Sequence, residues 1–201
     1  MPVTRDVPVR CRCGHLRGVA REVGPATANH GYCYCHDCRA YLHWLEREDL
    51  HDARGGTAII QVARARFEVT EGTDQLQCVR LSPKGLHRWY ARCCRTPIAN
   101  TVPALPFVGI ARGAFELPGA EDTATFGPRL SAWAGAALGG PPPGAGLTAR
   151  GLVHVTRLLA TWALLGHGHP TPLFDRENRP TVTPVVLSRE ERQRLREHPR
   201  A

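Results

Sequence analysis

The amino-acid sequence predicts a mainly β protein of the α+β class with a helical C-terminal extension. Short strand-like segments separated by Gly, Asp and Pro turns fill the chain from Val9 to about Asn100. Apolar residues then recur at helical spacing, and a capping pattern opens a polar segment near the C-terminus. The 201 residues, 42% of them hydrophobic, suffice for one domain with a substantial core. We expect a β domain over residues 1–135, a Gly- and Pro-rich loop over 136–146 and a helical extension over 147–201 packed on that domain.

Four segments in the first half are typical of strands: residues 58–62, 66–70, 76–81 and 86–91. Residues 71–74 and 82–85 carry the Gly, Asp, Ser and Pro that favour turns. Cys78 stands alone in the third segment. We therefore expect it to pack as an ordinary apolar side chain of its strand.

Helices are predicted at three places. Residues 39–47 lack Gly and Pro and are rich in aromatic and leucine side chains, which predicts a short helix. Apolar residues recur every three or four positions between 148 and 165, and this amphipathic helix is expected to dock on its own domain. The sequence Ser188-Arg189-Glu190-Glu191 fits the capping box of a last, polar surface helix that ends near Glu197.

Seven of the eight cysteines fall into three tight clusters. Thiolates with one or two residues between them can reach a common tetrahedral ion, whereas clusters this dense cannot all pair as unstrained disulfides. The pattern therefore predicts zinc sites. The clustered residues are Cys11 and Cys13, then Cys33, Cys35 and Cys38, then Cys93 and Cys94.

Composition and charge indicate the cellular compartment and limit the classes of binding partner. The N-terminus has no apolar secretory core, and no segment approaches the roughly 20 apolar residues that span a bilayer. We expect a soluble cytoplasmic protein without a membrane partner, in a compartment that keeps thiols reduced. The formal net charge is +8, but the basic residues, all arginine except Lys84, are spread along the chain and mixed with acids. That mixture argues against nucleic acid as a partner.

The cysteine motifs carry a family resemblance. With Arg10-Cys11-Arg12-Cys13-Gly14 near the start, Cys33-x-Cys35-x-x-Cys38-Arg39 further on, and Cys94-Arg95-Thr96-Pro97-Ile98 closing the region, the chain resembles the glutathione-dependent formaldehyde-activating enzymes. This family is also called centromere-protein-V-like. The match covers about the first half of the chain and implies a β-tent fold, in which small antiparallel sheets are joined by zinc.

The resemblance implies two zinc ions per chain. Cys11, Cys13 and Cys94 match ligands of a structural site, and Cys33, Cys35 and Cys38 match the three ligands of a catalytic site. Arg39 matches the basic residue that follows them and is expected to help bind the substrate.

The closing motif departs from the family pattern. Ala91 replaces its first cysteine, Arg95 replaces its glycine, and an additional thiol, Cys93, precedes Cys94. Cys93 is our first choice for the fourth structural ligand. Neighbouring side chains of a regular strand point to opposite faces, so Cys93 and Cys94 can share an ion only if the chain turns sharply. If it does not, the alternatives are that His15 or His87 completes the structural site or that Cys93 reaches toward the other zinc.

The function implied by the resemblance is that of a zinc-dependent carbon–sulfur lyase. Its substrate would be an adduct of glutathione, or of another small thiol, with a reactive carbonyl such as formaldehyde. Three cysteine ligands leave a fourth position for substrate. His36 or Asp37 would handle the proton, and Arg39, Arg88 and Lys84 are the cations that could engage substrate carboxylates.

Two other classes compete with the lyase. A noncatalytic zinc module would use both ions to hold its sheets together while it binds protein or nucleic acid. A redox thiol protein ranks last, because Cys35-x-x-Cys38 lies inside a three-cysteine cluster that metal would occupy. The apolar face of the long helix makes a homodimer an additional expectation.

Overall fold

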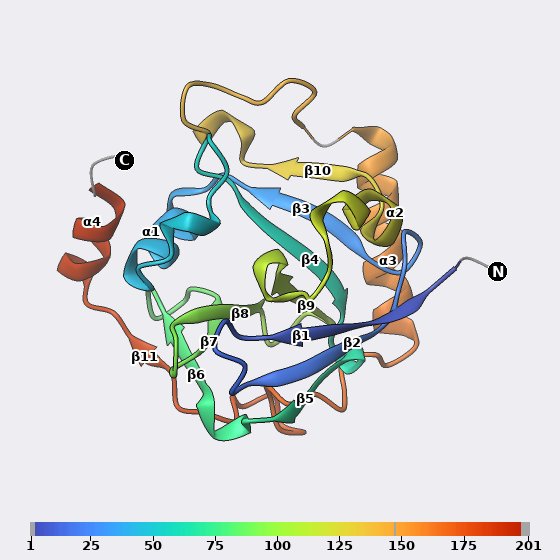
Figure 1. The fold of residues 1–201 in the computed structure, drawn as a ribbon, viewed down its shortest axis with the longest axis horizontal. Coiled ribbons are helices and arrows are strands. Elements are labelled where there is room, and N and C mark those ends of the chain that lie inside the picture. The colour runs from blue at the N-terminus through green and yellow to red at the C-terminus, as the bar shows by residue number, and fades with distance from the viewer. Residues whose placement is uncertain (1–2, 147, 198–201) are drawn as a thin grey trace.

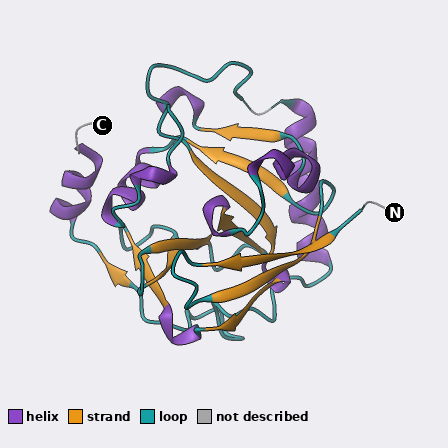
Figure 2. Ribbon diagram, viewed as in Figure 1, coloured by secondary structure: helices purple, strands orange, loops and turns teal. Residues whose placement is uncertain are grey.

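The computed structural model describes residues 3–146 and 148–197, and within these ranges it contains two β-sheets and four α-helices (Figures 1 and 2). The strands are β1 (Arg5–Arg10), β2 (Arg17–Val23), β3 (Asn29–Cys33), β4 (Thr57–Ala63), β5 (Phe67–Glu71), β6 (Leu76–Arg80), β7 (His87–Ala91), β8 (Thr96–Thr101), β9 (Phe107–Ala111), β10 (Arg129–Ala132) and β11 (Val185–Val186). The helices are α1 (His36–Trp44), α2 (Asp122–Phe126), α3 (Ala149–Leu164) and α4 (Arg189–Glu197).

The smaller sheet has the strand order β1-β2-β5, and the larger has the order β10-β3-β4-β9-β8-β7-β6-β11. Strands within each sheet are antiparallel, except that β10 runs parallel to β3 and β11 runs parallel to β6. This arrangement of mostly strands with a C-terminal helix confirms the predicted fold class.

One cluster of buried apolar side chains joins the two sheets. Val7 and Phe67 contribute to it from the smaller sheet, and Ile60 and Trp89 from the larger. Burial of such large side chains is the main source of folding free energy. Cys78 belongs to the same cluster and is 1% exposed, which confirms that its thiol packs as an apolar group of β6.

The four predicted strands are confirmed as β4, β5, β6 and β7, with small shifts at their ends. The sheet continues beyond Asn100, where no strand was predicted. There, β9 pairs with both β4 and β8, and β10 pairs with β3. These two strands are short and lack the alternation of apolar and polar residues by which strands are recognised.

The helix predicted over 39–47 begins earlier, at His36, and ends at Trp44. It begins there because Cys35 is the N-cap residue: its sulfur accepts a hydrogen bond from the Cys38 amide at 3.4 Å. Sequence rules assign this role to Ser, Thr, Asp or Asn, which explains the error. The early start places Cys38 in the first helical turn.

The long amphipathic helix α3 docks with only part of its apolar stripe. Leu158 and Trp162 are buried and pack with Ala63 of β4. Leu152 and Leu165, at the two ends of the stripe, stay 55% and 63% exposed. In the described part of the chain, neither α3 nor any other helix combines the length and apolarity needed to cross a membrane.

The last helix, α4, packs against α1 through ion pairs and apolar contacts. Asp37 at the start of α1 forms ion pairs with Arg192 at 3.0 Å and Arg196 at 2.7 Å of α4. Leu187 and Leu195 add apolar contacts to the residues of α1. The segment from β11 to α4 therefore packs beside the helix that carries Cys38 (Figure 1).

Candidate metal centres

Four cysteines converge where the two sheets meet. Cys11 and Cys13 follow β1, and Cys93 and Cys94 lie between β7 and β8. Their four sulfurs all lie within 4.8 Å of one another. The sulfurs of Cys11 and Cys13 are 3.6 Å apart, those of Cys11 and Cys93 3.7 Å, and those of Cys93 and Cys94 3.8 Å. An ion with tetrahedral Zn–S bonds of about 2.3 Å separates its sulfurs by about 3.8 Å, so this group fits zinc.

Cys93 reaches the group because the chain turns sharply after β7. The Cys94 amide donates to the Ala91 carbonyl at 3.5 Å, and Arg95 adopts a left-handed φ of 55° before β8 begins. Arg95 stands where the resembling family has glycine, the residue that tolerates this conformation best. Its guanidinium forms an ion pair with Glu46 at 2.8 Å. The turn abolishes strand alternation, so neighbouring thiols can point to the same place.

Neighbouring groups support the four-cysteine cluster. The Leu16 amide donates to the Cys11 sulfur at 3.3 Å, and the Thr96 hydroxyl lies 3.1 Å from the Cys94 sulfur. The Nδ1 atom of His15 lies 3.1 Å from the Cys13 sulfur, so this histidine contacts a cysteine without belonging to the four convergent groups.

Three further cysteines meet where β3 passes into α1. Cys33 ends the strand, Cys35 caps the helix and Cys38 lies in its first turn. Their sulfurs lie within 4.8 Å of one another, and those of Cys33 and Cys35 are 3.3 Å apart. Tyr34 is fully buried between them and donates its hydroxyl to Asp52 at 2.8 Å. This anchor fixes the backbone that presents Cys33 and Cys35.

Arg88 supplies a positive charge to this cluster. Its guanidinium lies 3.8 Å from the Cys38 sulfur, donates to the Asn100 side-chain oxygen at 3.4 Å and stacks 5.1 Å from the centre of the Tyr41 ring. Burial opposes the charge on this 3% exposed side chain, but the attraction of Cys38 outweighs it and raises the pKa of Arg88. The guanidinium is therefore committed to the cluster.

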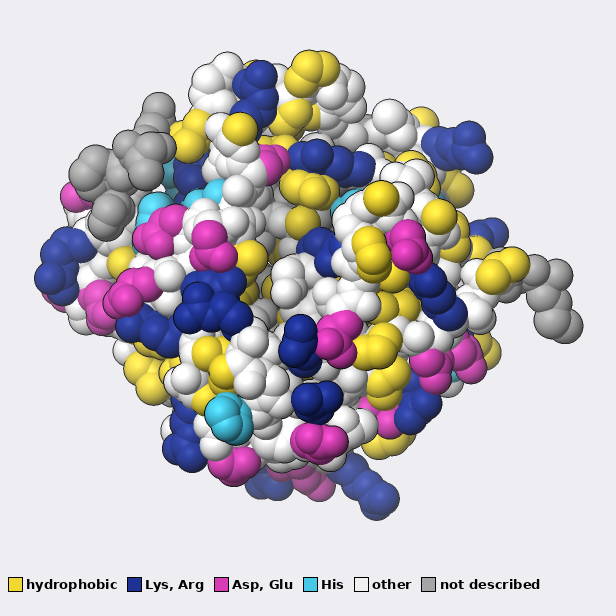
Figure 3. Space-filling model, viewed as in Figure 1, with side chains coloured by type: hydrophobic (Ala, Val, Ile, Leu, Met, Phe, Trp, Pro, Cys, Tyr) yellow, Lys and Arg dark blue, Asp and Glu magenta, His cyan; other side chains and the backbone are white. Residues whose placement is uncertain are grey.

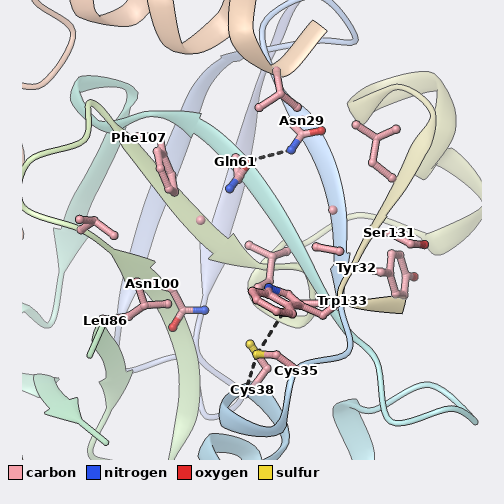
Figure 4. A pocket seen from close by; sticks show the side chains of 18 of the residues that line it. Asn29, Tyr32, Cys35, Cys38, Gln61, Leu86, Asn100, Phe107, Ser131 and Trp133 are labelled. Carbon is pink, nitrogen blue, oxygen red and sulfur yellow. Dashed lines mark hydrogen bonds between the residues drawn. The ribbon is translucent and has the colours of Figure 1, made fainter. Parts of the chain in front are cut away.

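A cavity of about 350 Å³ lies beside the three-cysteine cluster, and all three cysteines line it (Figure 4). Its floor comes from neighbouring strands of the larger sheet, and Val155 of α3 contributes to its wall. Trp133 lines the cavity while remaining 73% exposed, so it stands at the opening. Large apolar side chains also line it: Ile59, Leu86, Val102, Phe107 and Leu130.

Three amide side chains add polarity to the cavity (Figure 4). Asn29 donates to Gln61 across the β3–β4 pair at 2.5 Å, and its own buried oxygen has no hydrogen-bond partner in the described structure. Asn100 extends from β8, and because its oxygen accepts from Arg88, its amide nitrogen remains a donor. Sequence analysis missed these residues, because isolated amides carry no motif.

Several residues predicted for the site lie elsewhere. His36 and Arg39 line a different hollow of about 300 Å³, and Arg39 donates to the backbone carbonyls of Tyr34 and Ala136 at 2.8 Å each. Asp37 is paired with α4, as described above. His87 packs edge-on against Phe174, and Lys84 is exposed in the turn before β7. The catalytic role of His36 and the binding role of Arg39 stay predictions.

Comparisons with known proteins complete the description. No curated protein matches the chain significantly. A crystal structure of a Rhodobacter sphaeroides protein, determined as a structural genomics target, is similar at 17% identity with a TM-score of 0.44, over 62% of this chain and 99% of that one. The model of a family of unknown function, DUF6151, matches residues 3–183. Because this match spans most of the sequence, the protein belongs to the DUF6151 family.

Proposed function

We propose that the protein is a zinc-dependent enzyme that forms or cleaves the carbon–sulfur bond between a small thiol and a reactive carbonyl compound. One observation carries this proposal. Cys33, Cys35 and Cys38 line the cavity, and among the residues that the structure describes, no other part of its lining is a Cys, His, Asp or Glu that could complete a tetrahedral site. The fourth coordination position is therefore left to a molecule in the cavity, as in catalytic zinc sites.

A zinc ion held there would lower the pKa of a bound thiol and polarise a carbonyl oxygen. The chain's own residues do the rest. Three cysteine thiolates hold the ion, and Arg88 offsets the negative charge that three thiolates leave on a divalent ion. The apolar walls exclude water, and the Asn100 amide is placed to donate to a substrate oxygen.

The reaction is balanced without any oxidant or reductant. In the direction of synthesis, the thiol sulfur bonds to the carbonyl carbon, the carbonyl π electrons move to oxygen, and the proton lost by the thiol ends on that oxygen. Cleavage is the reverse. The cysteine motifs resemble those of enzymes with this chemistry, which is a second support for the proposal.

The four-cysteine cluster has a different role in this proposal. It takes all four ligands from the chain and ties the segment after β1, in the smaller sheet, to the turn after β7, in the larger. An ion with four protein ligands has no position for substrate and is structural. The protein would then hold two zinc ions with separate tasks.

The noncatalytic alternative gains less support. On the face in Figure 3, arginines lie among Asp and Glu side chains rather than in one basic patch. Several arginines of the chain are engaged in ion pairs, such as Arg21 with Glu68 at 2.6 Å and Arg112 with Asp122 at 2.7 Å. A purely structural zinc site also has no need of a cavity at its open side.

The test combines metal counting with ligand binding. Native mass spectra of the wild type should show two zinc ions, and cobalt in their place should change its visible absorption when a small thiol is added. Cys35→Ser should lose the thiol response, whereas Cys78→Ala, a matched change of a thiol outside both clusters, should keep it. Two bound zinc ions with no response to any thiol or thiol–carbonyl adduct would contradict the enzyme and favour the noncatalytic module.

A further inference from the structure

The cavity beside the three-cysteine cluster has an uncharged lining. Its described lining includes no Asp, Glu, Lys, Arg or His, and apart from the three cysteines its polar groups are amides, hydroxyls and the indole of Trp133. Arg88 lies behind the cluster, committed to Cys38 and Asn100. A carboxylate or ammonium group that entered this space would lose its hydration without gaining an opposite charge, which costs several kcal/mol per ion.

An amide pair marks one end of the cavity. Asn29 is 8% exposed, and its oxygen is buried without a hydrogen-bond partner in the described structure. In the Asn29–Gln61 pair, one amide nitrogen and one amide oxygen bond to each other, which leaves one donor and one acceptor free. Exchanging the nitrogen and oxygen of both amides gives the same outcome. The pair therefore places polar, uncharged groups at this end of the cavity, where a neutral polar group is better accommodated than a charged one.

Strand geometry fixes the distance from this pair to the cysteines. Asn29, Gly31 and Cys33 occupy alternate positions of β3, so their side chains share one face of the sheet. Four residues of an extended strand span about 13 Å. A molecule that reaches from the cysteine cluster to the amide pair is therefore elongated.

Two glycines contribute to the middle of the cavity. Gly31 and Gly109 form part of its floor from β3 and β9. A Cβ atom on Gly109 would come within 2.7 Å of Ile59, whereas a Cβ on Gly31 would meet only ordinary contacts at 3.6 Å and 3.9 Å and would occupy cavity space. Phe107 and Leu130 add apolar walls. This part of the cavity therefore suits an apolar portion of a ligand.

We propose that the cavity binds a neutral, elongated and mainly apolar molecule, with its thiol or carbonyl end at the cysteines and an amide-like group at Asn29 and Gln61. The identity of the reacting end rests on the proposed function. The neutral, elongated and mainly apolar character of the molecule rests on the cavity alone. It excludes glutathione as the molecule held inside, because its carboxylates would have no cationic partner there.

Three benzyl thiols that differ only in the group at the para position test the charge requirement. They are 4-(mercaptomethyl)benzamide, 4-(mercaptomethyl)benzoate and 4-methylbenzyl mercaptan, with glutathione as a fourth ligand and thiol-free 4-methylbenzamide as a fifth. Calorimetry on the zinc-loaded protein should give the benzamide at least about 100-fold tighter binding than the benzoate and glutathione. The methyl compound should fall between them, because it is neutral but leaves the amide pair unsatisfied.

Two substitutions locate the binding. Gly31→Val fills the cavity without removing a polar group, and it should weaken both amide ligands at least about 10-fold while both metals remain bound. Gly119→Val is the matched control, because a Cβ at Gly119 meets nothing within 4 Å and the residue is outside the cavity. Asn29→Leu should abolish the preference for the amide over the methyl compound. Circular dichroism and the metal count report whether each variant folds.

The outcomes separate this inference from the proposed function. Equal or tighter binding of the benzoate or glutathione overturns the ligand class and leaves the thiol chemistry standing. Binding of 4-methylbenzamide that Gly31→Val abolishes, with no thiol response from the cobalt protein, supports the ligand class and overturns the thiol chemistry. If neither amide ligand binds, or if Gly31→Val has no effect on either, the inference is wrong.

Discussion

The guanidinium of Arg88 lies 3.8 Å from the sulfur of Cys38 in the protein interior. The two residues come from different elements, Arg88 from β7 and Cys38 from α1, and they are 3% and 4% exposed. If the cluster holds a divalent ion as proposed, its three thiolates would leave one negative charge, which the buried arginine would balance. This pairing links the eight-stranded sheet to the proposed catalytic cluster.

Arg88→Met should weaken metal binding at the three-cysteine site by about 10- to 100-fold, because it removes a buried partner of a ligand while nearly conserving volume. The four-cysteine site should keep its metal. Competition with a chelator, followed by native mass spectrometry, measures both sites at once. Arg88→Lys keeps the charge but not the planar fork, so its metal affinity at the three-cysteine site should lie between those of the wild type and Arg88→Met. Equal loss from both sites would indicate general unfolding instead.

Removing one cysteine ligand should lower the stability of the protein more at the four-cysteine cluster than at the three-cysteine cluster. Cys93→Ser breaks the cluster that ties the two sheets together across a long stretch of chain, and a cross-link of that kind is worth about 2–4 kcal/mol. We expect the melting temperature to fall by roughly 10 °C. Cys33→Ser should lower it less, because Cys33 and Cys38 are already close along the chain.

Thermal unfolding of the two variants checks this prediction, once metal counting has shown that each retains one zinc per chain. A chelator that removes both ions from the wild type should lower the melting temperature at least as much as Cys93→Ser. If Cys33→Ser destabilises the protein more than Cys93→Ser, the assignment of structural and catalytic roles is reversed.

Asp52 should make stability depend on pH in acid. Burial works against its charge, but hydrogen bonds from the Gly56 and Arg54 amides at 2.8 Å outweigh it, and the pKa of Asp52 is lowered. Its contribution is complete above the unfolded pKa of about 3.9 and is lost as the pH falls through the lower folded pKa. Asp52→Asn should therefore cost about 1–2 kcal/mol near pH 6.

Denaturant unfolding of both proteins between pH 7 and pH 3 measures the difference. It should stay constant down to about pH 5 and shrink below pH 4, where the wild-type carboxyl is protonated. Comparing the two proteins at each pH cancels the loss of metal in acid, which affects both. A difference that does not shrink would show that packing, not charge, gives Asp52 its effect.

Thiol reactivity should rank the cysteines once metal is removed. Hydrogen bonds from the backbone and ring of His15 lower the pKa of the exposed Cys13 to about 5, whereas burial raises the pKa of Cys78 to about 12. Iodoacetamide at pH 7 should therefore modify Cys13 among the first and Cys78 last. Peptide mapping over time measures the order, and zinc should protect Cys13 but leave Cys78 unchanged. Early modification of Cys78 would mean that β6 opens readily.

The fold of the first half could be read from the sequence to a useful extent. The alternation and the turn residues of the segments that became β4 to β7 are local properties, and the structure reproduces them. The three-cysteine cluster is equally local, since its residues span one strand end and one helical turn. Spacing alone therefore predicted a metal site there.

Only the tertiary structure decided which distant groups complete these sites. Cys93 joins Cys11 because a turn with a left-handed Arg95 overrides strand alternation, and no spacing rule predicts that turn. The amide pair of Asn29 and Gln61 and the charge of Arg88 reach the cavity and the cluster through strand pairing. The sequence by itself determined which thiols lie close together along the chain and the metal-binding chemistry they offer, because ligand spacing is a short-range property of the chain. The space and the charge around that chemistry depend on contacts between residues far apart in the chain, which only folding establishes.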